Sequence, residues 1–244
     1  MCIRDSYILR KKIIIIGIIL FCAVKSLHAQ REIYRSYRDD LPYYFGLTLG
    51  YNKSYLHHTK SADFLASDSI MYVNPVSSGG IAMGLLATLK MNDHIELRAN
   101  PQLIIGGSKY IDYTLKSVKP GEQTQQQQIL PSTLVSLPAH FKLNSDRINN
   151  FRLYILGGVK FDFDLSSNST SRNADDLVKL RAADFGLEAG LGLNFYLPFV
   201  TVSPEIKFSY GLTNLHQLDR GLKYSNVLDK LQSRMIVFSI HLED

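Results

Sequence analysis

The chain has 244 residues, of which 45% are hydrophobic and 20% charged, a composition that suits one domain or one barrel with loops. Residues 1–29 hold five of the 27 basic and one of the 22 acidic residues, so the formal net charge of +5 falls to +1 without them. The remainder therefore has neither the basic footprint of a nucleic-acid-binding protein nor any cysteine for disulfides, thiolate metal sites or nucleophilic catalysis.

The N-terminus has the pattern of a secretory signal peptide. Three basic residues, 10–12, precede an apolar stretch, 13–24, that is too short to cross a bilayer. The small residue Ala29 then marks the expected cleavage point, so residues 1–29 are the expected signal peptide. Residues 1–6 do not fit the pattern and look like an artefact. An uncleaved membrane anchor is the alternative, which the short apolar stretch disfavours.

After this leader, eight segments alternate apolar and polar residues with a period of two, as strands with one apolar face do. The clearest are Phe185–Phe195 and Val200–Tyr210, each about the 9–11 residues that a tilted strand needs to cross a bilayer. Residues 30–42 are expected to form a short polar tail before them. In chain order, the expected strands are 43–53, 79–91, 94–105, 132–144, 151–164, 185–195, 200–210 and 233–243.

Three of these expected strands contain a proline, at positions 101, 138 and 204, which removes a hydrogen-bond donor from the ladder. A local bulge is expected to absorb each proline. The end of the third strand is open to two interpretations, because its pattern either stops near Ile105 or continues past Gly106 towards Leu115.

The connections alternate in length. Strands two and three, four and five, and six and seven are joined by short turns at 92–93, 145–150 and 197–198, and the others by long polar loops. Short turns on one side, long loops on the other and an even strand number are typical of outer-membrane barrels. The sequence thus predicts an all-β fold over residues 43–244, an eight-stranded antiparallel transmembrane β-barrel with short periplasmic turns and long outer loops. The glutamine-rich stretch 123–128 is expected to be a mobile loop.

Alternation alone leaves open which face points outward. A soluble eight-stranded barrel such as a lipocalin turns its apolar face inward around a ligand. Here the polar face is rich in glycine, which suits a narrow lumen, and its charges are of both signs and able to pair. We therefore expect the apolar face to meet lipid and a polar network to fill the lumen. Its expected members are Lys90, Glu96, Arg98, His140, Lys142, Lys160, Asp162, Glu188, Glu205, Lys207, His241 and Glu243.

No catalytic, metal or cofactor motif stands out. The carboxylates of Glu96, Glu188 and Glu205 are candidates for acid–base chemistry, but ion pairing inside a barrel explains them better. The adjacent histidines 57–58 are expected to be solvated in a polar loop rather than bound to a metal. The polar residues expected near the outer rim form no nucleophile–base pattern; they are Ser54, His57, Ser108 and His216. A protein without enzymatic activity or cofactor is expected.

Six short motifs carry a family resemblance. They are FGLTLGYN at 45–52, DFL at 63–65, DSI at 68–70, ELR at 96–98 with Pro101, LPAHFK at 137–142, and the stretch from Pro204-Glu205 to Gly211-Leu212. Together they resemble the PorT family, outer-membrane β-barrel components of the type IX secretion system of Bacteroidota, over roughly residues 43–242. The resemblance implies a role in protein transport across the outer membrane and, in some members, in gliding motility. It implies no catalytic residues.

The sequence leaves more than one function open. The first is a subunit of a secretion machinery in the outer membrane, with other secretion-system proteins as partners. The alternative is a generic small barrel of the OmpX/OmpA kind, acting in adhesion or envelope integrity. A soluble ligand-binding barrel is a third interpretation. Neither of the first two needs a nucleic acid or a small-molecule substrate, and a charge-filled lumen predicts negligible ion conductance.

Overall fold

The computed structural model describes residues 32–61, 70–106, 109–116, 124–130, 132–166, 180–217 and 228–244. The expected signal peptide, residues 1–29, lies outside them. Residues from Tyr34 onward form one compact unit, built of antiparallel strands and one short 3₁₀ helix.

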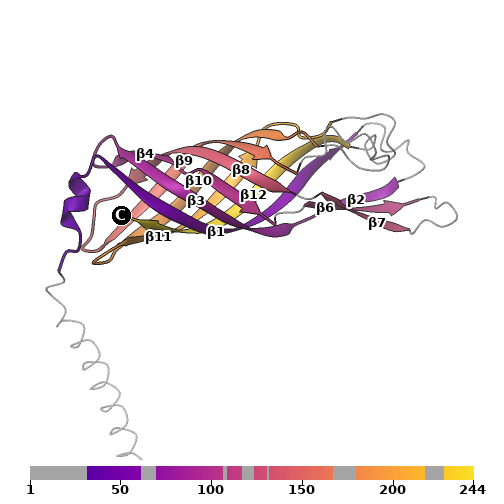
Figure 1. The fold of residues 1–244 in the computed structure, drawn as a ribbon. Helices are drawn as coiled ribbons and strands as arrows, with labels where there is room; N and C mark the ends of the chain where they lie inside the picture. Colours follow the sequence, from indigo (N-terminus) through magenta and orange to yellow (C-terminus); the bar gives the residue numbers. More distant parts are fainter. Residues whose placement is uncertain are drawn as a thin grey trace, which may run out of the picture. The chain divides into compact units, whose positions relative to one another are not determined.

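The barrel wall has eight antiparallel strand positions, called staves below, and it closes on itself (Figure 1). Their order is β1-β12-β11-β10-β9-β8, then β4 with β5 as one position, then β3, which pairs back with β1. Strands β4 and β5 are two halves of one stave, because both pair with β3 on one side and β8 on the other. The predicted eight-stranded antiparallel barrel is confirmed. The strands are β1 Tyr43–Lys60, β3 Ser78–Lys90, β4 Ile95–Ala99, β5 Gln102–Ile105, β8 Thr133–Asn144, β9 Phe151–Asp164, β10 Ala183–Tyr196, β11 Thr201–Gly211 and β12 Leu228–Glu243.

The strand prolines do not produce the expected bulges. Pro138 and Pro204 lie inside β8 and β11, whose pairings with β9 and β12 keep a single register along their length. Pro101 separates β4 from β5, yet the register with β8 is the same on both sides of it. The carbonyl of Pro101 still accepts a hydrogen bond from the Leu85 N–H at 2.9 Å. The expectation of bulges was wrong because each proline costs the ladder only one donor.

Most large apolar side chains of the barrel strands point away from the lumen. Burial alternates residue by residue along β8, β9 and β10, and most of the large apolar members of each strand are on the exposed side. Examples are Leu47, Leu49, Leu85, Leu137, Phe141, Ile155, Leu187, Leu191, Phe208 and Phe238. A barrel with its apolar face inward around a ligand, the soluble alternative, is therefore excluded.

Three further strands form a second sheet at the long-loop end of the barrel, in the order β2-β6-β7 (Figure 1). These are β2 Ile70–Val76, β6 Lys109–Leu115 and β7 Gln125–Leu130. In the barrel wall, Gly84 of β3 pairs with Gln102 of β5. Eight residues further outward along each chain segment lie Val76 and Tyr110, which pair in the second sheet. The pairing of β2 with β6 therefore continues the register of β3 with β5. This external sheet is thus an outward extension of the barrel wall.

The external sheet decides between two expectations about the third strand. Its continuation towards Leu115 is confirmed as β6, after a bend at Gly106, whose φ of 86° favours glycine. The glutamine stretch behaves differently from its prediction, because residues 125–128 belong to β7 and pair with β6. The mobile-loop expectation is wrong there, since a glutamine-rich segment without clear alternation becomes a strand when it adds to an existing ladder.

The first and last strands are longer than predicted. β1 and β12 pair from the short-turn end as far as Lys60 and Leu228, whereas β1 pairs with β3 only as far as Ser54. Their polar outer ends break the apolar alternation, so the sequence pattern stopped short of them. Pairing between the first and last strands, not local hydrophobicity, keeps these ends extended.

Candidate functional site

Arg98, on β4, lies at the centre of the polar network in the lumen. Its guanidinium donates to the carboxylates of Glu205 on β11 and Glu243 on β12, at 2.9 Å in each case. All three side chains are buried. Charges leave water at tolerable cost only when they are paired and hydrogen-bonded, and a guanidinium fork can serve two carboxylates at once. Arg98 therefore ties together three staves across the barrel.

Tyr154, on β9, fills the space beside this cluster. Its hydroxyl donates to Glu205 at 2.7 Å, and the Arg98 guanidinium lies 5.2 Å from the centre of its ring. The ring fits because β10 has Gly192 opposite it, where a Cβ atom would overlap the ring. An inward glycine and a large aromatic side chain thus share one level of a narrow lumen.

A second cluster joins Glu96 of β4 to Lys142 of β8. The Lys142 ammonium lies 3.0 Å from the Glu96 carboxylate, which also accepts a hydrogen bond from the Tyr44 hydroxyl at 2.7 Å. The ammonium is also 4.3 Å from the centre of the Tyr154 ring. This aromatic contact links the second cluster to the first.

Two histidines of the predicted network are also paired. His140 on β8 contacts the Glu188 carboxylate at 2.8 Å, and His241 on β12 contacts Glu205 at 3.2 Å. The Lys207 ammonium is 3.6 Å from Glu205, an ion-pair distance beyond hydrogen-bond range. Glu205 is therefore a carboxylate shared by Arg98, Lys207 and His241.

At the long-loop end the lumen is acidic. Lys160 pairs with Asp162 there, and the Ser132 hydroxyl donates to Asp164 at 2.9 Å. Lys109 reaches this mouth from β6 of the external sheet and is only 3% exposed. Burial lowers the pKa of Lys109, and the Asp164 carboxylate opposes that shift. The cavity lined by Lys109, Asp162 and Asp184 is about 10 Å³, roughly the space of one water molecule.

Apolar residues share the lumen with this network. They pack as one buried cluster from β3, β5, β8 and β12: Ala82, Ile104, Leu134, Met235 and Val237. Leu134 and Met235 also line the small acidic cavity. The inward face therefore carries an apolar layer next to the polar network. The sequence predicts only the polar network there and misses the apolar layer.

Eleven of the twelve residues predicted for the network are buried in the lumen. The exception, Lys90, lies at the short-turn end, where it is 2.9 Å from Asp93 and donates to the Asp39 carbonyl. The hydrogen bond from Lys90 lowers the pKa of the exposed Asp93. Sequence reasoning missed Tyr44 and Tyr154, although both occupy inward positions of the alternation.

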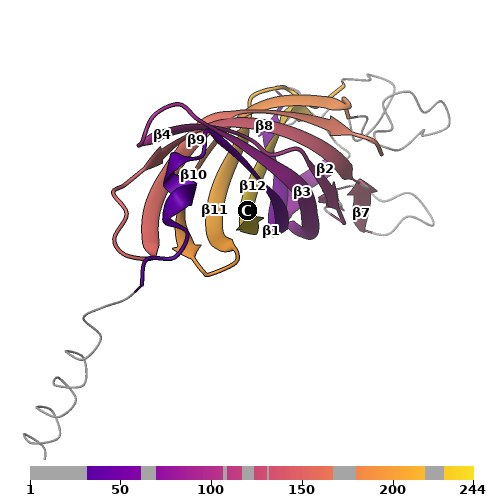
Figure 2. The same cartoon turned by 60° about the vertical axis from the view of Figure 1, so that its left-hand side comes forward.

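The segment before the first strand closes the short-turn mouth. It contains η2, a 3₁₀ helix over Ser36–Asp40, at the same end of the barrel as the C-terminus (Figure 2). Arg38 pairs with the Glu243 carboxylate, and its guanidinium lies 4.1 Å from the centre of the Tyr44 ring. Arg35 donates to the Glu243 carbonyl at 3.1 Å. Both arginines are buried, a role that the polar-tail expectation for 30–42 did not include.

The turn between β8 and β9 holds the same segment from the other side. Arg147 pairs with Asp39 at 3.0 Å and donates to the Tyr34 carbonyl. Arg152, at the start of β9, lies 3.3 Å from the same aspartate. The Tyr34 N–H donates to the side-chain oxygen of Asn150 at 2.8 Å. The N-terminal segment is thus fixed by charged contacts to both β9 and the C-terminus.

The rim candidates do not assemble. Ser54 is buried on the inward face of β1, whereas His57 is exposed on its outward face. His216 is buried next to Leu180, with which it forms an isolated bridge, and Ser108 lies outside the described residues. Within the described ranges no three His, Cys, Asp or Glu residues are grouped to hold a metal ion. No helix in that part of the chain is long and apolar enough to cross a membrane.

The chain aligns with several solved structures at low sequence identity. OprG from Pseudomonas aeruginosa aligns with a TM-score of 0.43 and 13% identity, over 81% of this chain and 94% of that one. Neisserial surface protein A gives 0.39 and 12%, over 81% and 96%. Ail, the attachment invasion locus protein of Yersinia pestis, gives 0.38 and 12%, over 84% and 100%. No curated protein matches the chain.

The family model described as "Outer membrane protein beta-barrel domain" matches residues 32–217, which is most of the chain. The match begins within the N-terminal segment that closes the short-turn mouth and extends past β11. It agrees with a closed barrel whose outward face is apolar and whose lumen is filled by paired charges. The chain therefore belongs to the outer membrane protein beta-barrel family, and its apolar wall faces the lipid of the outer membrane.

Proposed function

We propose that this protein is a non-enzymatic barrel that binds other proteins at the cell surface through its external sheet, in adhesion or envelope integrity. The observation that carries the proposal is the free edge of β7. In the part of the chain that is described, β7 pairs with β6 on one side and with no strand on the other. An edge strand offers unpaired N–H and C=O groups to which a strand of another protein can add.

The composition of β7 supports this role. Its six residues, Gln125–Leu130, include no charge and no proline, the two devices that usually protect an edge strand from pairing. On β2, at the other side of the external sheet, Met71 and Tyr72 are exposed by 67% and 52%. These side chains offer apolar contact area to a partner that covers the external sheet beyond the β7 edge.

The sheet is also held firmly enough to present that edge. Its register continues that of the barrel wall, and Lys109 of β6 is buried in the acidic mouth of the lumen. A partner would therefore meet a strand that is already ordered, which lowers the entropy cost of binding.

The lumen supports a role without transport or catalysis. Glu96, Glu188 and Glu205, the carboxylates with catalytic potential, are each engaged by a lysine, a histidine or a tyrosine hydroxyl. Pairing inside the barrel thus accounts for these carboxylates without a catalytic role. We expect such a barrel to anchor the external sheet and not to conduct ions.

Strand addition can be tested with two neighbouring proline variants, Gln126→Pro and Gln127→Pro. Along an edge strand, successive N–H groups point alternately to the paired strand and to the open side, so one proline blocks the open edge and the other disturbs β6. Cells carrying each variant would be compared for adherence to immobilised fibronectin, whose modules are sheet sandwiches with strand edges. Hydrogen exchange of residues 109–115 would report whether the sheet persists.

We expect wild-type cells to adhere above vector-only cells, and one proline to abolish adherence while residues 109–115 stay protected. Adherence at the vector-only level, or adherence unchanged in both variants, would overturn the proposal.

A secretion role, implied by the resemblance to the PorT family, is the second candidate. Of its motifs, FGLTLGYN at 45–52 lies on β1 and LPAHFK at 137–142 lies on β8, whereas 63–65 falls outside the described residues. In a clean deletion strain, type IX cargo trapped in the periplasm would support this candidate, and normal secretion would exclude it. Under either candidate we propose that residues 1–29 are removed on export, which N-terminal sequencing of the mature protein tests.

A further inference from the structure

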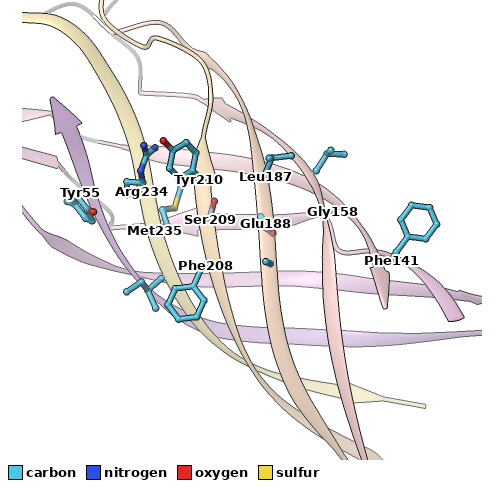
Figure 3. Close-up of a pocket in the computed structure, with 13 residues that line it drawn as sticks. Tyr55, Phe141, Gly158, Leu187, Glu188, Phe208, Ser209, Tyr210, Arg234 and Met235 are labelled. Carbon is cyan, nitrogen blue, oxygen red and sulfur yellow. The ribbon is translucent and has the colours of Figure 1, made fainter. Parts of the chain in front are cut away.

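The lipid-facing wall has a hollow that is unrelated to the external sheet. It has a volume of about 820 Å³ and runs across the outward face from β8 to β12 and the end of β1 (Figure 3). The outward side chains around it are almost all apolar, with one cation, Arg234, at one end. Elsewhere the outward face of the barrel is covered by large apolar side chains, so the question is which residues leave this space open.

Two small residues lie between two phenylalanines that line the hollow. Across the strands, one level of the wall runs from Phe141 through Gly157 and Ala189 to Phe208, each paired with the next. The two phenylalanines are the walls of a trough, because the residues between them have little or no side chain. Packing does not force a glycine at 157, since a Cβ there would meet nothing closer than the Glu188 carbonyl oxygen at 4.0 Å.

The trough ends at a cation at the long-loop end. Arg234 lies beside Tyr210, its guanidinium carbon 3.2 Å from the centre of the ring (Figure 3). Its Nη1 donates to the carbonyls of Gly211 at 3.1 Å and Ser233 at 3.0 Å, and its Nη2 to the Gln232 side-chain oxygen at 3.4 Å, which fixes the orientation of the guanidinium. An oriented guanidinium is well suited to bind a phosphate.

A second cation lies diagonally across from Arg234 on the neighbouring strand β1. Lys53 is exposed on the outward face of β1 and pairs with Ile236, two residues from Arg234. Diagonal neighbours on adjacent strands are about 7–8 Å apart, so both long side chains reach a common anion. Among the described residues, neither cation has a carboxylate within ion-pair distance.

From this arrangement we propose that the hollow binds a phosphorylated acyl lipid of the outer leaflet, with an acyl chain in the trough and a phosphate on Arg234 and Lys53. The long-loop end of such a barrel lies at the outer surface, so the cations stand at headgroup level and the trough extends into the hydrocarbon. The cations and the trough thus lie at the same depths in the membrane as the phosphate and the acyl chain of such a lipid.

The charge of the wall disfavours a second copy of the chain as the occupant. On the eight staves, the outward positions that the structure describes include no aspartate or glutamate. A neighbouring barrel packed wall to wall would therefore bring no anion to Arg234 or Lys53, so both cations would be covered without a partner.

The test is native mass spectrometry of the full-length barrel in nonionic detergent, titrated with diphosphorylated lipid A and, in parallel, with the dephosphorylated lipid. Three variants accompany the wild type. Arg234→Gln removes the cation, and Gly157→Leu fills the trough at a position with room for a side chain. Lys230→Gln is the matched control, because Lys230 is exposed on β12, the strand of Arg234, but does not line the hollow. Circular-dichroism melting confirms that each variant is folded.

We expect the wild type to prefer the phosphorylated lipid by about tenfold, the size of one charge-assisted hydrogen bond. Arg234→Gln should remove this preference, Gly157→Leu should weaken binding of both lipids, and Lys230→Gln should change neither. Equal binding of the two lipids by the wild type, or binding unaffected by Gly157→Leu, would overturn the proposal. A dimer that Gly157→Leu dissociates would overturn it in favour of self-association.

Discussion

Glu243, near the end of the last strand, accepts hydrogen bonds from Arg98 inside the lumen and from Arg38 of the N-terminal segment. One buried carboxylate thus joins the centre of the polar network to the segment that closes the short-turn mouth. Since Arg38 and Glu243 are 205 positions apart, this contact also ties the beginning of the folded unit to its end.

The first prediction concerns the stability that this carboxylate provides. Glu243→Gln leaves two buried guanidinium groups with too little negative charge, and removing one partner of a buried pair costs about 3–5 kcal/mol. We expect a corresponding loss of unfolding free energy in urea titrations of the detergent-folded barrel. Asp244→Asn is the control, because its side chain is 96% exposed and its pair with Arg35 is worth less than about 1 kcal/mol. Equal effects of the two variants would contradict the shared role of Glu243.

The second prediction compares two glycines on opposite faces of the wall. Gly192→Ala places a Cβ against the Tyr154 ring and should destabilise the barrel by about 1–3 kcal/mol through overpacking. Gly157→Ala meets open space and should be close to neutral. Thermal melting of both variants is the measurement, and Tyr154→Leu should relieve the strain of Gly192→Ala. A neutral Gly192→Ala would mean that the lumen is looser than the contacts indicate.

The third prediction concerns the link between the external sheet and the barrel. Lys109→Ala removes a buried cation from the acidic mouth, so the contact of β6 with the lumen should weaken. We expect faster hydrogen exchange in residues 109–115 and unchanged exchange in residues 236–242 of β12. Lys230→Ala, at an exposed position, should leave both segments unaffected. Uniformly faster exchange across the barrel would show that Lys109 stabilises the whole fold instead.

The fourth prediction concerns conductance. The lumen is filled by paired charges and an apolar cluster, and Arg35 and Arg38 lie across one mouth. We expect no stepwise current in planar bilayers for the wild type. Arg38→Ala should also remain silent, because the Arg98 and Lys142 clusters fill the barrel beyond the mouth. Stable pores of nanosiemens size in the wild type would contradict a closed lumen.

The strands and their faces were predictable because alternation is a local property of the backbone. Runs such as Phe185–Phe195 assign each side chain to a face before any partner is known. An apolar outward face then followed for the barrel strands, and the inward position of Arg98 could be read directly from its own strand.

Contacts between distant strands were decided only by the tertiary structure. The sequence by itself determined eight staves and their two faces, whereas register and closure brought Arg98 to carboxylates 107 and 145 positions away. The same holds for two other features. Residues 125–130 form the strand β7 because β6 offers an edge to pair with, and Arg38 is buried because it lies at the short-turn mouth of the barrel. Alternation fixes the direction of a side chain, but its partner depends on how strands far apart in the chain are aligned around the barrel.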